Sequence, residues 1–307
     1  MLLNINNIVI GKYLLSLFYY KDVILDERNF GNSSDFVIKY LKSARKDDSI
    51  AQCNLGECFY YGRGITQDYN KAFEWYSKSA HNGYSEGQNN LGNCYYYGNG
   101  VEQNYNYKKA FEWYSESANN GNARGQNYLG DCYYYGNGVE QNYNKAFEWY
   151  SKSASNGYVE GLYNLGYCYQ YGQGVAQDYK KAFECYSQLA NNGHAKGQNN
   201  LGFCYRNGIG TEKDYNKAFE WYFRSANNGC AKGQFNVGFC YENGIGTDKD
   251  YNKAFEWYLN SAAAGSAMAK LIQEASRIQS EQKLTKKSYD QLIDEEFEKL
   301  WWPDPYI

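Results

Sequence analysis

Histidine and proline are scarce in this sequence, with only two residues of each among 307. Both histidines, His81 and His194, lie beside a glycine that we expect to end a helix. The sequence therefore offers neither a His-rich metal site nor a Ser-His-Asp arrangement, and we expect no catalytic residue, no metal and no cofactor. Both prolines lie in the segment Trp301-Trp302-Pro303-Asp304-Pro305, which cannot continue a helix.

The sequence also lacks a strong charge bias and a long apolar run. Its formal net charge of −3 argues against a nucleic-acid partner, which would need a basic face. No window reaches the roughly 18–20 uninterrupted apolar residues of a membrane span, so we expect no membrane insertion. The apolar stretch 1–20 has no basic leader and no evident cleavage site, which argues against a secretory signal. We therefore expect a cytoplasmic protein.

The sequence does contain a repeat unit, which is present in six copies. Each copy has a leucine, or a valine in the last copy, at the same place, and these residues are Leu55, Leu91, Leu129, Leu165, Leu201 and Val237. Their separations are 36, 38, 36, 36 and 36 residues. A fixed period of this size indicates stacked units that bury their apolar faces against one another. We expect six repeats over 51–265, with degenerate capping segments over 1–50 and 266–307.

Each unit predicts a helical hairpin. In the second copy Leu91, Cys94 and Tyr95 are spaced i, i+3 and i+4, which places them in one stripe of a first helix. Gly92 beside this stripe indicates the close approach of a neighbouring helix, because glycine otherwise weakens a helix. The second helix should begin at an Asp or Asn cap. The predicted caps are Asp68, Asn104, Asn142, Asp178, Asp214 and Asp250.

The nine cysteines do not predict a disulfide framework. Six of them are the third residue after the repeated leucine or valine, namely Cys58, Cys94, Cys132, Cys168, Cys204 and Cys240. Equivalent helices in a stack lie about 8–10 Å apart, whereas a disulfide needs Cα atoms within roughly 7 Å. We therefore expect these six to be buried, reduced thiols. A contact between Cys168 and Cys185 within one unit stays open.

Several motifs recur in every copy with small changes: Leu-Gly-x-x-Tyr, Gly-x-Gly-Val, Asp/Asn-Tyr-x-Lys-Ala-Phe-x-Trp-Tyr and Ala-x-x-Gly. Together they resemble the Sel-1-like repeat family, which is related to the tetratricopeptide repeats. The resemblance covers 51–265 and implies an all-α fold, a right-handed α-solenoid of helix-turn-helix repeats. It also implies an adaptor that holds protein complexes together.

One feature of some family members is missing. Cysteine-rich secreted bacterial members carry a cysteine near the end of each second helix, which crosslinks the two helices of the repeat. The matching positions here are Ala80, Ala118, Ala154, Ala190, Ala226 and Ala262. The resemblance therefore does not extend to that disulfide framework.

Three positions in each first helix vary between copies while the core positions repeat. They are spaced i, i+4 and i+7 and lie about 160° from the Leu91 stripe. We call them the variable strip and predict that they are exposed in a concave groove, where aromatic residues would anchor a partner. Neutral drift of exposed positions would give the same variation. The candidate partner-binding residues are Glu57, Tyr60, Asn89, Asn93, Tyr96, Asn127, Asp131, Tyr134, Tyr163, Tyr167, Gln170, Asn199, Phe203 and Arg206.

These observations favour a non-enzymatic adaptor or scaffold that binds a protein or peptide segment along the groove. Two alternatives stay open. The first is a hydrolase of the kind proposed for some secreted bacterial relatives, which would use groove carboxylates such as Glu57 or Asp131. The second is a carbohydrate-binding surface, since walls rich in tyrosine and asparagine also suit sugars, with Tyr96 and Tyr134 as contacts.

Overall fold

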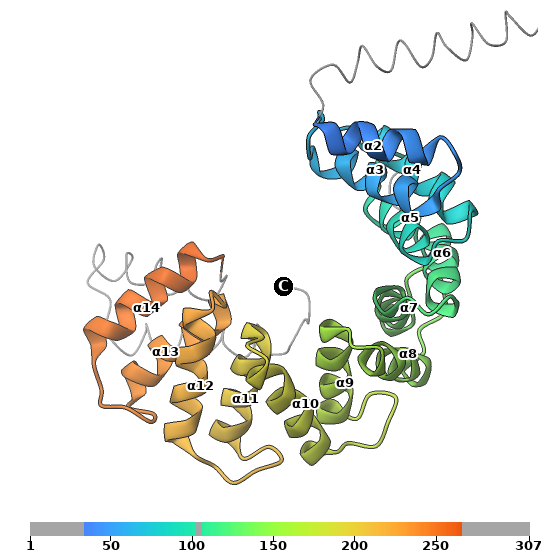
Figure 1. Cartoon of the computed structure of the whole chain (residues 1–307). Helices are drawn as coiled ribbons and strands as arrows, with labels where there is room; N and C mark the ends of the chain where they lie inside the picture. Colours follow the sequence, from blue (N-terminus) through green and yellow to red (C-terminus); the bar gives the residue numbers. More distant parts are fainter. Residues whose placement is uncertain (1–33, 102–105, 266–307) are drawn as a thin grey trace, which may run out of the picture. The chain divides into compact units, whose positions relative to one another are not determined.

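The computed structural model describes residues 34–101 and 106–265, and these residues form thirteen α-helices and no β-strand (Figure 1). The helices are α2 (Asp35–Ala44), α3 (Ser49–Tyr61), α4 (Tyr69–His81), α5 (Ser85–Tyr97), α6 (Tyr107–Asn119), α7 (Ala123–Tyr135), α8 (Tyr143–Ser155), α9 (Val159–Tyr171), α10 (Tyr179–Asn191), α11 (Ala195–Asn207), α12 (Tyr215–Asn227), α13 (Ala231–Asn243) and α14 (Tyr251–Ala263). The predicted C-terminal capping segment and most of the N-terminal one lie outside the described residues.

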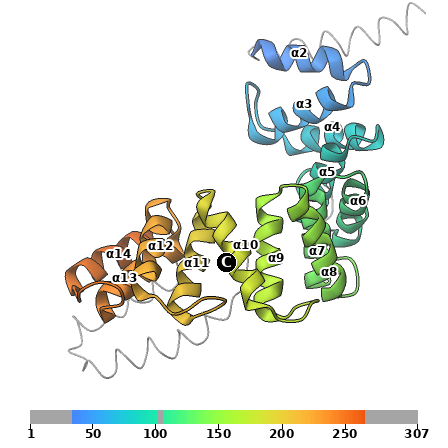
Figure 2. The same ribbon diagram turned by 60° about the horizontal axis from the view of Figure 1, so that its bottom comes forward.

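The chain divides into two compact units, Met1–Asn142 (unit 1) and Tyr143–Ile307 (unit 2). Unit 1 contains α2 to α7, and unit 2 contains α8 to α14. Within each unit every helix packs against the next one in the sequence, so consecutive helices lie side by side (Figure 2). The first helices of successive hairpins also contact each other, as α3 does α5, α5 does α7 and α11 does α13. Each unit is thus a stack of antiparallel helices.

The ends of the helices follow from single residues. Each first helix ends at a glycine in the left-handed conformation, such as Gly98 with φ 73°, a conformation that side chains disfavour. The second helices begin at capping side chains, as in α4, where Asp68 Oδ1 accepts a hydrogen bond from Lys71 N at 3.0 Å. The same cap recurs at Asp178, Asp214 and Asp250.

The predicted cap at Asn104 is wrong. Helix α6 is capped by Asn106, whose Oδ1 accepts a hydrogen bond from Lys109 N at 3.0 Å. The sequence Asn106-Tyr107-Lys108-Lys109 preserves the cap-Tyr-x-Lys order of the other copies. The two extra residues of this repeat therefore precede the cap, where they leave the helix unchanged.

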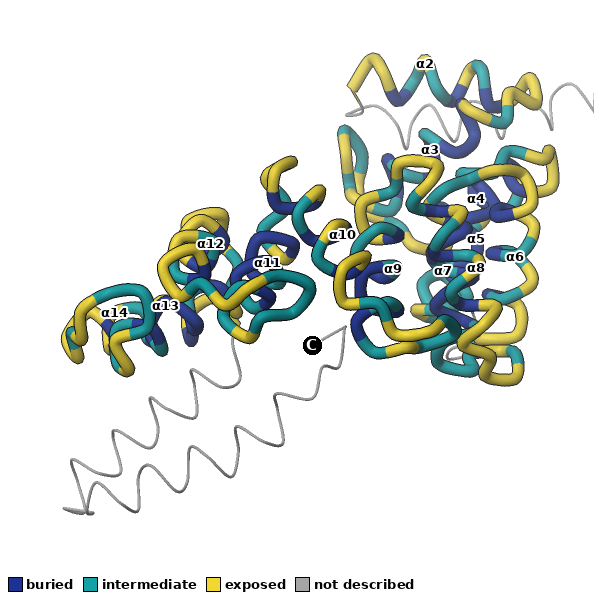
Figure 3. Tube along the Cα trace, turned by 90° about the horizontal axis from the view of Figure 1, so that it is seen from below, coloured by how far each residue is buried: buried dark blue, intermediate teal, exposed yellow. Residues whose placement is uncertain are grey.

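The core of each hairpin depends on a glycine that faces a tyrosine. A Cβ added to Gly92 would lie 2.6 Å from Cδ1 of Tyr114, so the close approach predicted for this glycine is confirmed. Tyr114 is 1 % exposed, and Leu91, Cys94 and Ala110 of the same hairpin are buried as well. Figure 3 shows buried segments along the helices, while the connecting loops are mostly exposed.

Recurrent polar contacts, which the sequence reading missed, join the helices. Ser117 donates its hydroxyl to Ser85 O at 2.7 Å, and Asn120 Nδ2 donates to Gln88 Oε1 at 2.9 Å. Gln88 Nε2 in turn donates to Ala80 O of the preceding hairpin at 3.3 Å. The first repeat shows the same pattern at Ser79, Asn82 and Gln52, and the fifth repeat at Ser225, Asn228 and Gln198.

All nine cysteines lie in the described part of the chain, and all are free thiols. The six repeat cysteines are buried, as predicted. Burial raises the pKa of Cys94 to about 12, so this thiol stays protonated at neutral pH. Cys168 and Cys185 are likewise buried and unbonded.

Candidate functional site

The variable strip is not the exposed surface that its sequence predicts. None of its fourteen candidate residues is exposed. Six are buried, and these are Asn89, Asn127, Asp131, Tyr167, Gln170 and Asn199. The other eight are half-buried, and these are Glu57, Tyr60, Asn93, Tyr96, Tyr134, Tyr163, Phe203 and Arg206. The prediction of an exposed strip is therefore wrong, because the first helices of successive hairpins pack against one another along it.

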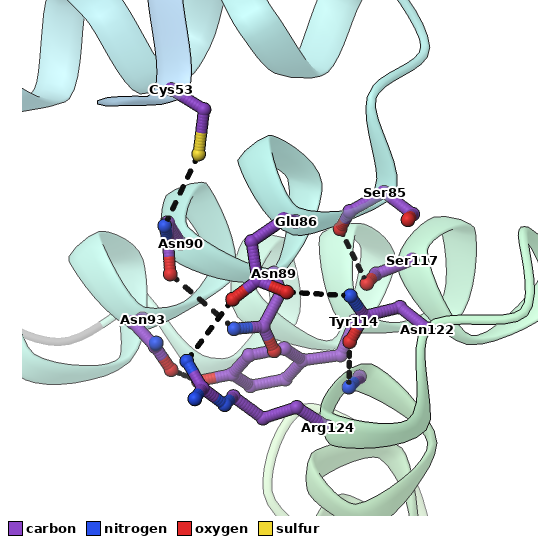
Figure 4. A network of polar contacts seen from close by, with 11 residues as sticks. Cys53, Ser85, Glu86, Asn89, Asn90, Asn93, Tyr114, Ser117, Asn122 and Arg124 are labelled. Carbon is purple, nitrogen blue, oxygen red and sulfur yellow. Dashed lines mark hydrogen bonds and ion pairs between the residues drawn. The ribbon is translucent and has the colours of Figure 1, made fainter. Parts of the chain in front are cut away.

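Polar side chains bridge the first helices where they meet (Figure 4). In unit 1 Asn90 Nδ2 donates to Cys53 Sγ of the preceding hairpin at 3.5 Å. Asn89, which is fully buried, donates to Asn90 Oδ1 at 3.4 Å. In unit 2 Asn236 Nδ2 donates to Asn199 Oδ1 at 2.8 Å. These asparagines therefore hold the stack together and are not available to a partner.

Other residues of the strip accept a hydrogen bond from the hydroxyl of a buried tyrosine in the second helix. In unit 1 the Tyr114 hydroxyl donates to Asn93 Oδ1 at 2.8 Å, as Figure 4 shows. In unit 2 the Tyr186 hydroxyl donates to Gln170 Oε1 at 2.9 Å, and the Tyr258 hydroxyl to Glu242 Oε2 at 2.7 Å. A buried hydroxyl without a partner is costly, so these acceptors are structural.

The polar residue occupies a different strip position in the two units, and in α9 and α13 it is the acceptor of the tyrosine hydroxyl. The middle position of the strip is polar in α3, α5 and α7 and the last position is tyrosine, giving the pairs Glu57/Tyr60, Asn93/Tyr96 and Asp131/Tyr134. In α9, α11 and α13 the order is reversed, giving Tyr167/Gln170, Phe203/Arg206 and Phe239/Glu242. The variation between copies is thus a correlated exchange of one aromatic and one polar residue, one helical turn apart.

The exposed part of this face in unit 1 consists of tyrosines that the prediction did not include. Tyr61 and Tyr97, the last residues of α3 and α5, are 57 % and 51 % exposed. Tyr69 and Tyr107, the first residues of α4 and α6, are also exposed. The signal that could have found them is the tyrosine run before the turn glycine, as in 95–97. We call these four tyrosines, together with the half-buried Tyr60 and Tyr96 of the variable strip, the tyrosine patch, and it comprises Tyr60, Tyr61, Tyr69, Tyr96, Tyr97 and Tyr107.

The rings of the patch form two clusters with one geometry. Tyr60 lies with its ring centroid 4.9 Å from that of Tyr61 and 5.1 Å from that of Tyr69. The equivalent distances from Tyr96 are 5.0 Å to Tyr97 and 5.1 Å to Tyr107. All four contacts are edge-to-face, an arrangement that aromatic pairs prefer. Each cluster therefore holds its exposed rings in a fixed orientation.

A hydrogen bond links the two clusters. Asn99 Nδ2, in the turn after α5, donates to the Tyr60 hydroxyl at 2.9 Å. Asn137, in the turn after α7, makes the equivalent bond to the Tyr96 hydroxyl at 3.1 Å. Burial, followed by the neighbouring Tyr107, Tyr97 and Asp131, raises the pKa of Tyr96 to about 12. The bond from Asn99 thus joins the first cluster to the turn that follows the second.

The charges of the first helices differ between the units. In unit 1 they comprise Glu57, Glu86, Asp131 and Arg124, three carboxylates against one guanidinium. Arg124 is paired with Glu86 at 3.0 Å. In unit 2 they comprise Glu160, Glu242, Lys196, Lys232 and Arg206, two carboxylates against three basic groups. The first helices therefore carry a net charge of −2 in unit 1 and +1 in unit 2.

The described residues contain no cluster of three or more His, Cys, Asp or Glu side chains suited to a metal ion. His81 is exposed at the end of α4. His194 is half-buried and caps α11, because its Nδ1 accepts a hydrogen bond from Gly197 N at 3.2 Å. Among the helices of the described segments, none is long and apolar enough to cross a membrane.

Comparisons with known proteins agree with this architecture. The family model described as Sel1 repeat matches six segments, which are 49–84, 85–122, 123–158, 159–194, 195–230 and 231–266. None of the curated proteins compared with the chain matches it. One similar solved structure is an Escherichia coli protein described as a protective antigen of uropathogenic strains with an SLR fold, 32 % identical, with a TM-score of 0.66. The match covers 84 % of this chain and 56 % of that protein.

A second similar structure is a Sel1 repeat protein from Oxalobacter formigenes, 27 % identical, with a TM-score of 0.67. That match covers 75 % of this chain and 97 % of the Oxalobacter protein. The family model, the repeated helical hairpins and these two structures support the predicted all-α solenoid fold. The chain belongs to the Sel1 repeat family.

Proposed function

We propose that the protein is a non-enzymatic adaptor or scaffold that binds a protein or peptide segment through the tyrosine patch of unit 1. The observation that carries this proposal is the exposure of Tyr61 and Tyr97, 57 % and 51 %, beside Tyr69 and Tyr107. A contiguous exposed aromatic surface marks an interaction site more often than isolated apolar residues do. Tyrosine suits such a site because it offers a large apolar ring and a hydroxyl at low entropic cost.

The patch replaces most of the variable strip as the proposed contact surface. Tyr60 and Tyr96 belong to both and remain in the proposal. The six buried strip residues are left out, because their side chains pack or form hydrogen bonds inside the stack. For Glu57, Asn93, Tyr134, Tyr163, Phe203 and Arg206 a contact with the partner stays a prediction.

Site-specific photo-crosslinking in cells would test the proposal. Benzoylphenylalanine in place of Tyr97 should crosslink to a protein, and the same label in place of Tyr251 should not. Tyr251 is a matched control because it is 60 % exposed but lies in unit 2, at the start of α14. Recovery of the same products from both sites, or of none from Tyr97, would contradict the proposal.

Two substitutions test how much the patch contributes to the free energy of binding. With a partner in hand, Tyr61→Ala and Tyr97→Ala should each weaken binding about fivefold or more, the effect of losing an interface residue worth at least about 1 kcal/mol. Tyr251→Ala should leave the affinity unchanged. A glycan array on which the chain binds sugars, with binding lost in Tyr61→Ala and Tyr97→Ala, would instead identify a carbohydrate-binding surface.

We also propose that the protein works in the cytoplasm. The support is that all nine cysteines are free and that eight of them are buried, as in a reducing compartment. Trapping of thiols in freshly lysed source cells should label every cysteine after denaturation. Protected cysteines that react only after reduction would contradict this location.

A further inference from the structure

The face of the first helices twice places a guanidinium on an aromatic ring. In unit 1 Arg63 Cζ lies 4.7 Å from the centroid of the Tyr61 ring. In unit 2 Arg206 Cζ lies 4.4 Å from the centroid of the Phe239 ring. Both distances are within the range of a cation–π contact, and the planar guanidinium stacks on rings more readily than an ammonium does. The surroundings of these rings therefore suit arginine.

The second repeat offers the same ring without the cation. Tyr97 stands 36 residues after Tyr61, and the residue equivalent to Arg63 is Asn99. The Asn99 amide is directed to the Tyr60 hydroxyl, as described above. In the described part of the chain the one ring contact of Tyr97 is its edge-to-face contact with Tyr96. About half of Tyr97 is exposed, so its ring is accessible to a side chain from outside.

The charge near Tyr97 is negative. Helix α7, which packs against α5, carries Asp131, and its carboxylate contributes to the raised pKa of both Tyr96 and Tyr97 after the larger effect of burial. Asp131 is 8 % exposed and accepts a hydrogen bond from Asn127 Nδ2 at 3.2 Å. A buried carboxylate is weakly screened, so it attracts a cation placed on the adjacent ring.

We propose that Tyr97, supported by Tyr96 and Tyr107 and by the charge of Asp131, receives an arginine side chain of the partner segment. This inference rests on the proposed function and names the chemistry of the partner at the same site. The partner is a peptide segment with an arginine that takes, at the second repeat, the place that Arg63 takes at the first.

Selection from a displayed peptide library against the full chain, followed by affinity measurements, tests this inference. Selected peptides that bind the patch should share an arginine. Replacing that arginine by citrulline, which has the same shape without the charge, should weaken binding about two- to fivefold, the effect of an exposed cation–π contact. Tyr97→Ala should weaken binding of the arginine peptide similarly and should abolish the effect of citrulline.

Further variants separate the contact from folding. Tyr97→Phe keeps the ring and should preserve the preference for arginine over citrulline, whereas Asp131→Asn should reduce it. Tyr251→Ala serves as the control for an exposed tyrosine outside the patch, and thermal unfolding of each variant shows that it is folded. A preference for arginine that survives in a folded Tyr97→Ala variant would overturn the inference.

The failure of this inference is distinguishable from that of the proposed function. Peptides that need Tyr61 and Tyr97 but carry no arginine, or that bind equally well with citrulline, overturn the inference and leave the peptide-binding function in place. Selected peptides that bind with unchanged affinity to Tyr61→Ala and Tyr97→Ala overturn both. The same holds if only glycans, and no peptides, bind at the patch.

Discussion

The first helices of unit 1 and unit 2 meet the same packing requirement in two ways. In unit 1 Asn93 accepts the hydrogen bond of the buried Tyr114 hydroxyl, and Tyr96 follows one turn later. In unit 2 the aromatic residue comes first, as Phe239, and the acceptor follows as Glu242. The difference shows that variation among repeats can be compensated inside the stack, so it does not by itself mark a surface that recognises a partner.

The exposed ends of the same helices differ in a way that does concern recognition. α3 and α5 end in the exposed tyrosines Tyr61 and Tyr97, whereas α11 and α13 end in Asn207 and Asn243. An asparagine offers less apolar surface to a partner than a tyrosine ring does. Together with the opposite net charges of the first helices, this contrast leads us to place the proposed binding site in unit 1.

The largest difference in stability between the two units is expected when the glycines that face the core are replaced by alanine. Gly92→Ala would place a methyl group 2.6 Å from Tyr114 Cδ1. We expect it to lower the free energy of unfolding by about 1–3 kcal/mol, a typical cost of overpacking. Gly166→Ala in unit 2 should cost less, because the nearest atoms, in Cys185 and Tyr186, are 3.0 Å away. Urea denaturation of both variants measures the difference.

The control follows from helix propensity. Alanine gains about 1 kcal/mol over glycine in a helix, and both positions share that gain. Equal losses in the two variants would therefore show that the distance to the facing side chain does not set the cost.

The next largest effect is expected when the unit 2 order, with the aromatic residue before the polar one, is introduced into unit 1. Asn93→Tyr removes the acceptor of the Tyr114 hydroxyl and should lower the free energy of unfolding by about 1–3 kcal/mol. Adding Tyr96→Gln supplies an acceptor one turn later, as Gln170 does for Tyr186. The double variant should recover most of the loss. A double-mutant cycle with Tyr96→Gln alone measures the coupling, and strictly additive losses would contradict the exchange.

The sequence was sufficient for the fold because the fold depends on local signals that recur in every copy. The turn glycines and the Asp caps each act within one hairpin, the period repeats them along the chain, and the structure has them where they were expected. The cap of α6 was misplaced because Asn104 and Asn106 both precede a tyrosine, and only the Tyr-x-Lys order that follows distinguishes them.

The candidate site was less predictable because burial depends on contacts between hairpins. Asn89 looks like a surface residue on the helix that carries it, yet it is fully buried where successive first helices meet. Tyr97 is the opposite case, since it is not among the predicted contact residues and yet is 51 % exposed. The spacing of residues along one helix predicts on which side of that helix a side chain lies, but it does not predict how close the next helix is.

The smallest effect concerns a cap that titrates in only one unit. His194 caps α11 in unit 2, whereas Asn122 caps α7 in unit 1 through Gly125 N at 2.8 Å. Burial lowers the pKa of His194, with Glu160 opposing and Lys196 reinforcing the shift. Because the folded state favours the neutral ring, this contribution to stability is present above the unfolded pKa of about 6.5 and is lost as the pH falls through the folded pKa.

Protonated Nδ1 of His194 cannot accept a hydrogen bond from Gly197 N, so α11 should lose at most about 1 kcal/mol of stability in acid, the usual value of a cap. Amide hydrogen exchange at the start of α11, corrected for the intrinsic pH dependence, should accelerate between about pH 7 and pH 5 relative to the start of α7. His194→Asn should make the two helices behave alike, and a difference that persists in this variant would assign the pH dependence to another group.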